Sequence, residues 1–166
     1  MSERKKIKCV ACGGTFDLLH KGHKTLLKKA FEVGEQVFIG LCTDEFVKTL
    51  KKNHEVSPYG ERLAELVRFL IEEDLIERAE IVSLEDPHGP AAWDESVDAI
   101  IVSEETKAET EKINEFRVKN GLKPLEVICI PMVLAEDGLP ISSTRIRIGE
   151  IDREGRLLRQ VECKQT

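Results

Sequence analysis

Residues 7–23, IKCVACGGTFDLLHKGH, decide the fold of this chain. The run Ile7–Cys12 is short and apolar, which is typical of a buried strand. Gly13 and Gly14 follow it and let the backbone approach a ligand without an intervening Cβ atom. Helical periodicity begins at His23. The sequence therefore predicts a strand, a glycine-rich turn and a helix in direct succession.

The rest of the chain repeats this alternation. Strands are expected over Ile7–Cys12, Val37–Cys42, Glu80–Leu84, Ala99–Val102 and Glu126–Ile130. Helices are expected over His23–Val33, Asp44–Leu50 and Glu104–Asn120, from a start capped by Ser57 and Pro58, and from Ser142 onward. This rhythm predicts one α/β domain over residues 1–166: a Rossmann-like, doubly wound parallel sheet of five strands with helices on both faces. Ligands of such sheets bind beyond the carboxyl ends of the strands.

Composition narrows the function. The chain has 166 residues, 41% of them hydrophobic, and a net charge of −6. A negative total disfavours a general nucleic-acid binder, which is usually basic. No apolar run approaches the roughly 20 residues that span a bilayer. We therefore expect a cytoplasmic protein with neither a nucleic-acid nor a membrane partner.

The five cysteines include one C-x-x-C pair, Cys9 and Cys12. Both fall within the first expected strand, so we interpret them as reduced, buried thiols. A structural zinc site would need a second pair of ligands, which the sequence lacks. A metal or redox protein built on this pair stays as an alternative.

Two polar motifs follow expected strands. In His20-Lys21-Gly22-His23 the two histidines can project from the same side of a helix start, where free amides and the helix dipole favour phosphate. The pattern is neither the dinucleotide G-x-G-x-x-G nor a P-loop. In Ile141–Arg147, ISSTRIR, Ser142 can cap a helix whose hydroxyls and amides suit the β- and γ-phosphates of a nucleotide. Arg147 can reach back to clamp charge.

At these residues the chain resembles a known family. Gly14-Thr15-Phe16-Asp17 with His20-Lys21-Gly22-His23, and Ile141-Ser142-Ser143-Thr144 ending in Arg147, resemble the paired signatures of cytidylyltransferase-like nucleotidyltransferases. The resemblance implies that His23 contacts the α-phosphate, that His20 stabilises the transition state and that Thr15 orients the attacking phosphate. It also implies an ATP site that includes Gly14, Phe16, His23, Ser142, Ser143, Thr144 and Arg147.

The order of the remaining segments, from about Ile7 to Gly155, is similar to the archaeal type of phosphopantetheine adenylyltransferase. This implies adenylyl transfer from ATP, with Mg²⁺, to 4′-phosphopantetheine, giving dephospho-coenzyme A and pyrophosphate. It also implies that adenosine lies at Ser103 and Glu104, and that one of Lys48, Lys51 and Lys52 meets the acceptor phosphate. Gly60 departs from the family, which usually has an acidic residue there.

Three matters stay open from the sequence. The signatures are expected to bind phosphate groups, which all candidate substrates share. The acceptor is therefore alternatively nicotinamide mononucleotide or flavin mononucleotide, and the donor is alternatively CTP. A non-catalytic nucleotide-binding module is a second alternative. The oligomeric state is a monomer or a small homo-oligomer.

Overall fold

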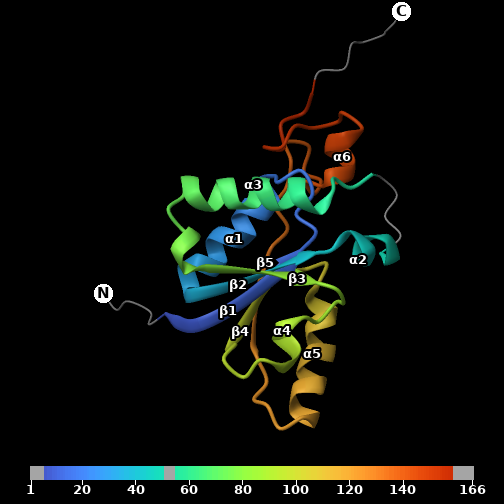
Figure 1. The fold of residues 1–166 in the computed structure, drawn as a ribbon. Helices are drawn as coiled ribbons and strands as arrows, with labels where there is room; N and C mark the ends of the chain where they lie inside the picture. The colour runs from blue at the N-terminus through green and yellow to red at the C-terminus, as the bar shows by residue number, and fades with distance from the viewer. Residues whose placement is uncertain (1–5, 51–54, 159–166) are drawn as a thin grey trace, which may run out of the picture.

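The computed structural model describes residues 6–50 and 55–158. It contains one five-stranded sheet, all parallel, in the order β3-β2-β1-β4-β5 (Figure 1). The strands are β1 Ile7–Gly14, β2 Gly34–Cys42, β3 Ala79–Leu84, β4 Ala99–Ser103 and β5 Glu126–Ile130. The helices are α1 Lys21–Val33, α2 Asp44–Thr49, α3 Tyr59–Glu72, the 3₁₀ turn η1 Ile76–Arg78, α4 Pro90–Trp93, α5 Lys107–Lys119 and α6 Ser143–Arg147. The predicted fold class is confirmed.

The two faces of the sheet belong to two apolar clusters, because successive strand residues point to opposite sides. On one face, Val10 and Cys12 of β1 pack with α1 and α3. On the other, Cys9 and Ala11 pack with α4 and α5. Figure 1 shows the same division, with α1 and α3 on one side of the sheet and α4 and α5 on the other.

The sheet opens between its two central strands. β1 pairs with β2 as far as Gly14, but with β4 only through Val10 and Ala11. The strand order also reverses at this point, since β2 and β3 lie on one side of β1 and β4 and β5 on the other. A crevice beyond the carboxyl ends of the strands is expected at such a switch point.

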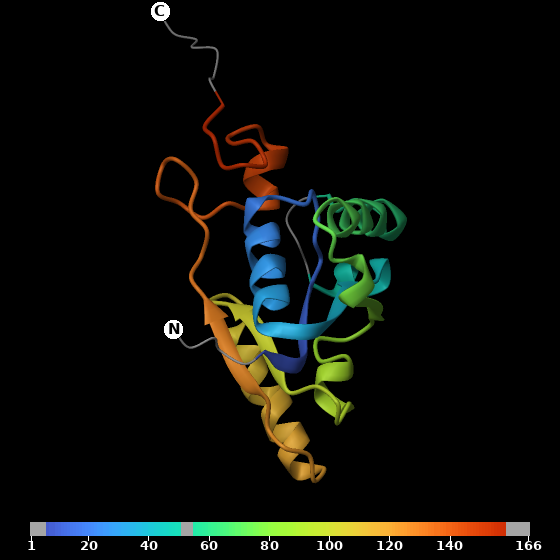
Figure 2. The same ribbon diagram turned by 90° about the vertical axis from the view of Figure 1, so that its left-hand side faces the viewer.

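The chain after β5 crosses back over this crevice. It runs past α6 to the start of α1, where the Lys21 amide donates to the Arg153 carbonyl at 2.8 Å (Figure 2). A small cluster of Ala135, Ile141 and Ile151 holds this segment together. No helix in the described part of the chain is long and apolar enough to cross a membrane.

Two predicted helix starts are wrong, one because of a contact with another element and the other because of a local turn. Ser57 does not cap α3: the N-cap is Pro58, and the Tyr59 amide donates to Asp44 Oδ1 of α2 at 3.0 Å. The helix expected from Glu104 begins only at Lys107, because the Thr106 amide closes a turn on the Ser103 carbonyl at 3.1 Å. Local patterns show helix signals but not the side chains that a fold brings to them.

No loop separates α1 from β2, because Gly34 both caps the helix and begins the strand. A Cβ atom built on Gly34 would lie 2.7 Å from Cγ2 of Val10 and 3.2 Å from the Ala30 carbonyl oxygen. The helix can therefore turn directly into the sheet only where the residue has no side chain.

We predict that Gly34→Ala lowers the free energy of unfolding by about 1–3 kcal/mol, the usual cost of forcing a methyl group into a packed site. Gly60→Ala is the matched control: it lies on α3, where an added Cβ meets nothing within 4 Å. It should raise stability by up to about 1 kcal/mol through helix propensity. Urea unfolding of both variants checks this, and equal changes would contradict it.

Candidate active site

The crevice is a cavity of about 640 Å³ above the splayed ends of β1 and β4. Nine predicted residues line it: Gly14, Thr15, Phe16, His20, His23, Ser103, Ser142, Ser143 and Thr144. Lys48, Glu104 and Arg147 do not line it, and Lys51 and Lys52 lie outside the described residues. The two signatures, more than 100 residues apart, therefore meet in one cavity.

The two histidines cap α1 reciprocally. His20 is the N-cap residue, and its Nδ1 accepts from the amides of Gly22 at 3.1 Å and His23 at 3.4 Å. Nδ1 of His23 accepts in turn from the His20 amide at 3.2 Å. The rings stack with their centroids 3.7 Å apart. This is a capping box in which histidines replace the usual hydroxyl and carboxylate.

The caps also decide which ring nitrogen carries the proton. A neutral imidazole has one donor and one acceptor nitrogen, so an Nδ1 that accepts leaves the proton on Nε2. Burial, and next the positive charge of Arg153, lower the pKa of His20 to about 4, against the opposing effect of Asp17. His20 is therefore neutral at physiological pH and presents Nε2–H as a hydrogen-bond donor.

The turn between β1 and α1 is strained. Phe16 and Leu18 have φ angles of 51° and 50°, in the left-handed region that side chains rarely adopt. Phe16 is buried, and its ring meets that of His23 edge-on with centroids 5.3 Å apart. Strain of this kind persists only where surrounding contacts hold it, and it gathers at functional sites.

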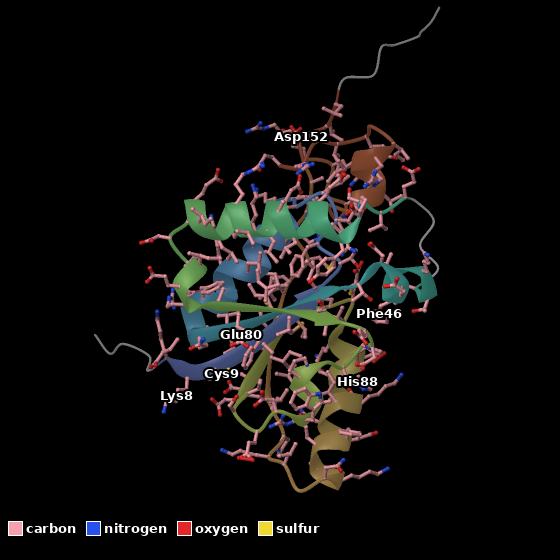
Figure 3. The ribbon with its side chains drawn as sticks, in the orientation of Figure 1. Lys8, Cys9, Phe46, Glu80, His88 and Asp152 are labelled. Carbon is pink, nitrogen blue, oxygen red and sulfur yellow. The ribbon has the colours of Figure 1, made fainter. Side chains whose placement is uncertain are left out.

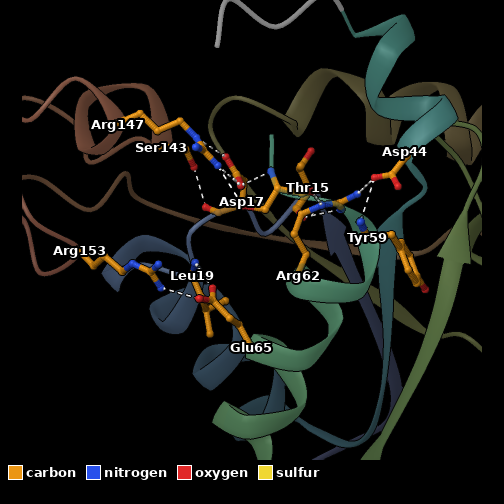
Figure 4. Close-up of polar contacts among 11 residues, drawn as sticks. Thr15, Asp17, Leu19, Asp44, Tyr59, Arg62, Glu65, Ser143, Arg147 and Arg153 are labelled. Carbon is orange, nitrogen blue, oxygen red and sulfur yellow. Dashed lines mark hydrogen bonds and ion pairs between the residues drawn. The ribbon is translucent and has the colours of Figure 1, made fainter. Parts of the chain in front are cut away.

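Asp17 supplies much of that hold and joins the two signatures (Figure 4). Its carbonyl accepts from the Ser143 hydroxyl at 2.7 Å. Its carboxylate accepts from Arg147 at 3.0 and 3.2 Å, and from the Ser57 amide at 3.0 Å. Burial opposes ionisation, but the hydrogen bonds from Arg147 and Ser57 outweigh it and lower the pKa of Asp17. Arg147 thus binds protein, outside the residues that line the cavity.

The second signature presents hydroxyls to the cavity. Ser142 caps α6 by accepting from the Arg145 amide at 3.2 Å, and Ser143 and Thr144 follow on the cavity wall. Arg145, at a variable position of the motif, is paired with Asp137 and with Glu150. Its role is to hold the C-terminal segment.

Known proteins share these features. Residues 11–149 match the family model described as cytidylyltransferase-like. The phosphopantetheine adenylyltransferase of Methanosarcina mazei is 48% identical over 154 residues, 91% of this chain and 97% of the relative. That of Pyrococcus furiosus is 43% identical over 159 residues, 96% and 99% of the two chains. The chain belongs to the cytidylyltransferase-like family, in its phosphopantetheine adenylyltransferase group. The resemblance inferred from the sequence is confirmed.

Solved structures of other proteins share this fold. An Archaeoglobus fulgidus protein of unknown function is 29% identical, with a TM-score of 0.66 over 75% of this chain and 89% of that one. The lipopolysaccharide core biosynthesis protein of Thermoplasma volcanium, 18% identical with a TM-score of 0.58 over 75% and 96% of the two chains, shares the fold. The cytidylyltransferase-like family thus explains both the topology and the two signatures.

Several residues of this family member's cavity were missed by sequence reasoning. Phe46 and Leu50, four apart on one side of the α2 segment, form part of its wall, whereas Lys48 between them is exposed. His88 and Glu109 also line the cavity, with Nε2 and Oε1 3.8 Å apart. Figure 3 shows Phe46 and His88 at the same end of the sheet. The spacing of Phe46 and Leu50 was visible in the sequence, but the pairing of His88 with Glu109 was not.

The C-x-x-C pair has no shared site. Cys9 and Cys12 face opposite sides of β1 in separate apolar clusters, and three residues of strand span about 10 Å. They can neither bridge nor bind one metal ion in this fold. Burial raises the pKa of Cys12 to about 12 and, together with the charge of Asp98, that of Cys9 to about 11. The expected burial of both thiols is confirmed.

The lowered pKa of His20 has a consequence for acid stability. An unfolded histidine titrates near 6.5. Between that value and about 4 the unfolded chain binds the extra proton, so this stability is present above pH 6.5 and lost as pH falls through 4. Relative to His20→Asn, which can still cap α1, the natural chain should lose about 2 kcal/mol between pH 6.5 and 4.5.

Urea unfolding of both chains across this range checks the prediction. Parallel pH dependences would show that burial does not hold His20 neutral.

Proposed function

We propose that this protein transfers the adenylyl group of ATP to 4′-phosphopantetheine and releases pyrophosphate, the step that forms dephospho-coenzyme A. One observation carries the proposal: two imidazoles at the start of α1 and the hydroxyl-rich start of α6 line the same cavity. This chain covers nearly the full length of two relatives named phosphopantetheine adenylyltransferase, and their names support the choice of substrates.

The chemistry asks the protein mainly to orient and to stabilise charge. An oxygen of the acceptor phosphate attacks the α-phosphorus of ATP, a new P–O bond forms, and the bond to the bridging oxygen breaks. The electron pair leaves with pyrophosphate. The acceptor phosphate is already an anion, so no general base is required. Catalysis then depends on in-line positioning and on donors aimed at the oxygens where charge develops.

The neutral histidines suit that task. Because Nδ1 of each ring accepts from a backbone amide, the Nε2–H groups are the donors, and the stacked rings hold them close together. We assign His23 to the α-phosphate and His20 to the transition state beside it. The amide-rich start of α1 adds further positive potential.

The other roles follow the lining of the cavity. Ser142, Ser143 and Thr144 would bind the β- and γ-phosphates, while Arg147 acts through Asp17 to hold them in place. The adenosine would lie against Gly14, Phe16 and Ser103, with Glu104 at the rim of the cavity. Thr15 would orient the acceptor phosphate. Lys48 and Lys51 would attract that phosphate as it arrives.

Magnesium enters as part of the substrate. Among residues 6–50 and 55–158, no three His, Cys, Asp or Glu side chains converge to hold a metal ion. The hydroxyls of the ISST segment suit a triphosphate that carries its own Mg²⁺, which usually keeps several water ligands. We also propose a cytoplasmic reaction without a nucleic-acid or membrane partner, in line with the net charge of −6.

The direct test is pyrophosphate release with ATP and Mg²⁺, offering 4′-phosphopantetheine, nicotinamide mononucleotide or flavin mononucleotide, then repeating with CTP. We expect release with ATP and 4′-phosphopantetheine alone. Release with another pair would reassign the substrates but keep the chemistry. Binding of ATP with no release from any pair would favour a nucleotide-binding module.

A second prediction separates capping from catalysis at His23. His23→Ala should lower kcat/KM by at least about 100-fold, because it removes a donor from the reacting phosphate. His23→Glu is the control, since glutamate at this position can still cap the His20 amide but has no N–H donor. It should keep the stability of the natural chain while losing most of the rate. Near-normal turnover of either variant would remove the assigned role.

A further inference from the structure

Arg62 of α3 is fully buried, and its guanidinium is bonded entirely to protein (Figure 4). Nε donates to the Ser57 carbonyl at 2.7 Å. Nη1 donates to the carbonyls of Thr15 at 3.0 Å and Cys42 at 2.8 Å. Nη2 pairs with Asp44 Oδ1 at 2.9 Å. One side chain therefore ties together four segments of the chain.

Three of these segments border the cavity. Thr15 follows β1, Cys42 ends β2, and Asp44 begins α2, whose Phe46 lines the cavity. The charge of Asp44 balances that of Arg62, so the guanidinium has no need of a ligand anion. What it provides is fixed geometry, because its planar fork offers five N–H donors in set directions.

We propose that Arg62 is a positioning residue for the acceptor phosphate. By holding the Thr15 carbonyl and the first residue of α2 at once, it fixes the hydroxyl of Thr15 relative to the acceptor side of the cavity. The inference rests on the proposed function, since Thr15 is assigned to the acceptor there. Lysine at this position keeps the charge but, with three donors on one nitrogen, cannot reach all four partners.

The fold contains a matched control. Arg117 of α5 is equally buried and also donates to backbone carbonyls, those of Lys123, Ala91, Asp94 and Val97. It lines a hollow beside Ile7 and Glu126, which begin β1 and β5. Arg117 therefore does comparable structural work at the end of the sheet away from the reaction.

The test compares Arg62→Lys with Arg117→Lys in steady-state kinetics with ATP and 4′-phosphopantetheine. Arg62→Lys should lower kcat/KM for the acceptor about 100-fold, as expected for a small displacement of a reacting group. Its KM for ATP should change by less than about threefold, because the ATP groups on α1 and α6 do not contact Arg62. Arg117→Lys should lower the melting temperature but keep natural kinetics. The same kinetic loss in Arg117→Lys would overturn the proposal.

A second variant covers the case in which Arg62→Lys does not fold. The Asp44 side chain is half exposed, so Asp44→Ala should fold while releasing one arm of Arg62. We expect a selective loss of kcat/KM for the acceptor of about tenfold, which is the usual contribution of one hydrogen bond to a charged group. Natural kcat/KM for the acceptor in this variant would count against Arg62 as a positioning residue.

A readout without substrate separates this inference from the proposed function. The amide of Phe16 shares a peptide bond with the Thr15 carbonyl, so its NMR resonance should move in Arg62→Lys. If only Asp44→Ala folds, the resonance should move in that variant. It should stay unchanged in Arg117→Lys. If the natural chain releases no pyrophosphate with ATP and 4′-phosphopantetheine, the proposed function fails while this shift still reports on Arg62. An unmoved Phe16 resonance would overturn the positioning role.

Discussion

The buried carboxylate of Asp17 is the contact on which the rest of the site depends. It binds Arg147, 130 residues further along the chain, and the same residue's carbonyl takes the Ser143 hydroxyl. This link directly joins the turn after β1 to the helix α6. Burying a charge is costly unless it is paired and hydrogen-bonded, and Asp17 satisfies both conditions. The carboxylate and carbonyl of Asp17 thus fix the two signatures relative to each other.

The two signatures bring hydrogen-bonding side chains to the cavity wall. The histidines use one ring nitrogen to cap α1 and so turn the other toward the ligand side as N–H. Both helix starts add amides. The arginines near the site, Arg62 and Arg147, have their charges matched by carboxylates. In the proposed reaction such a site needs little rearrangement when charge moves onto the phosphate oxygens.

The sequence predicted the class of fold and nine of the residues that line the cavity, because both depend on short-range patterns. Apolar runs indicate the strands, and the H-x-G-H and ISST segments each indicate the start of a helix. It failed where a distant side chain intervenes. Ser57 resembled a helix cap but binds Arg147 and Asp17. Nor could the sequence show that Arg62 is buried and reaches four carbonyl or carboxylate partners. The contact of Arg147 with Asp17 and Ser57 was also not visible in the sequence.

The direct passage from α1 into β2 through Gly34 shapes how the chain reaches its native state. β1, α1 and β2 form a unit of neighbouring residues, 7–42, whose contacts need little loop closure and can form early. The link from Asp17 to α6 requires nearly the whole chain to have been synthesised. Contacts within residues 7–42 can therefore form early in folding, while the cavity is completed only when α6 joins the turn after β1. The active site thus forms later than the first strands, because its two signatures lie more than 100 residues apart in the chain.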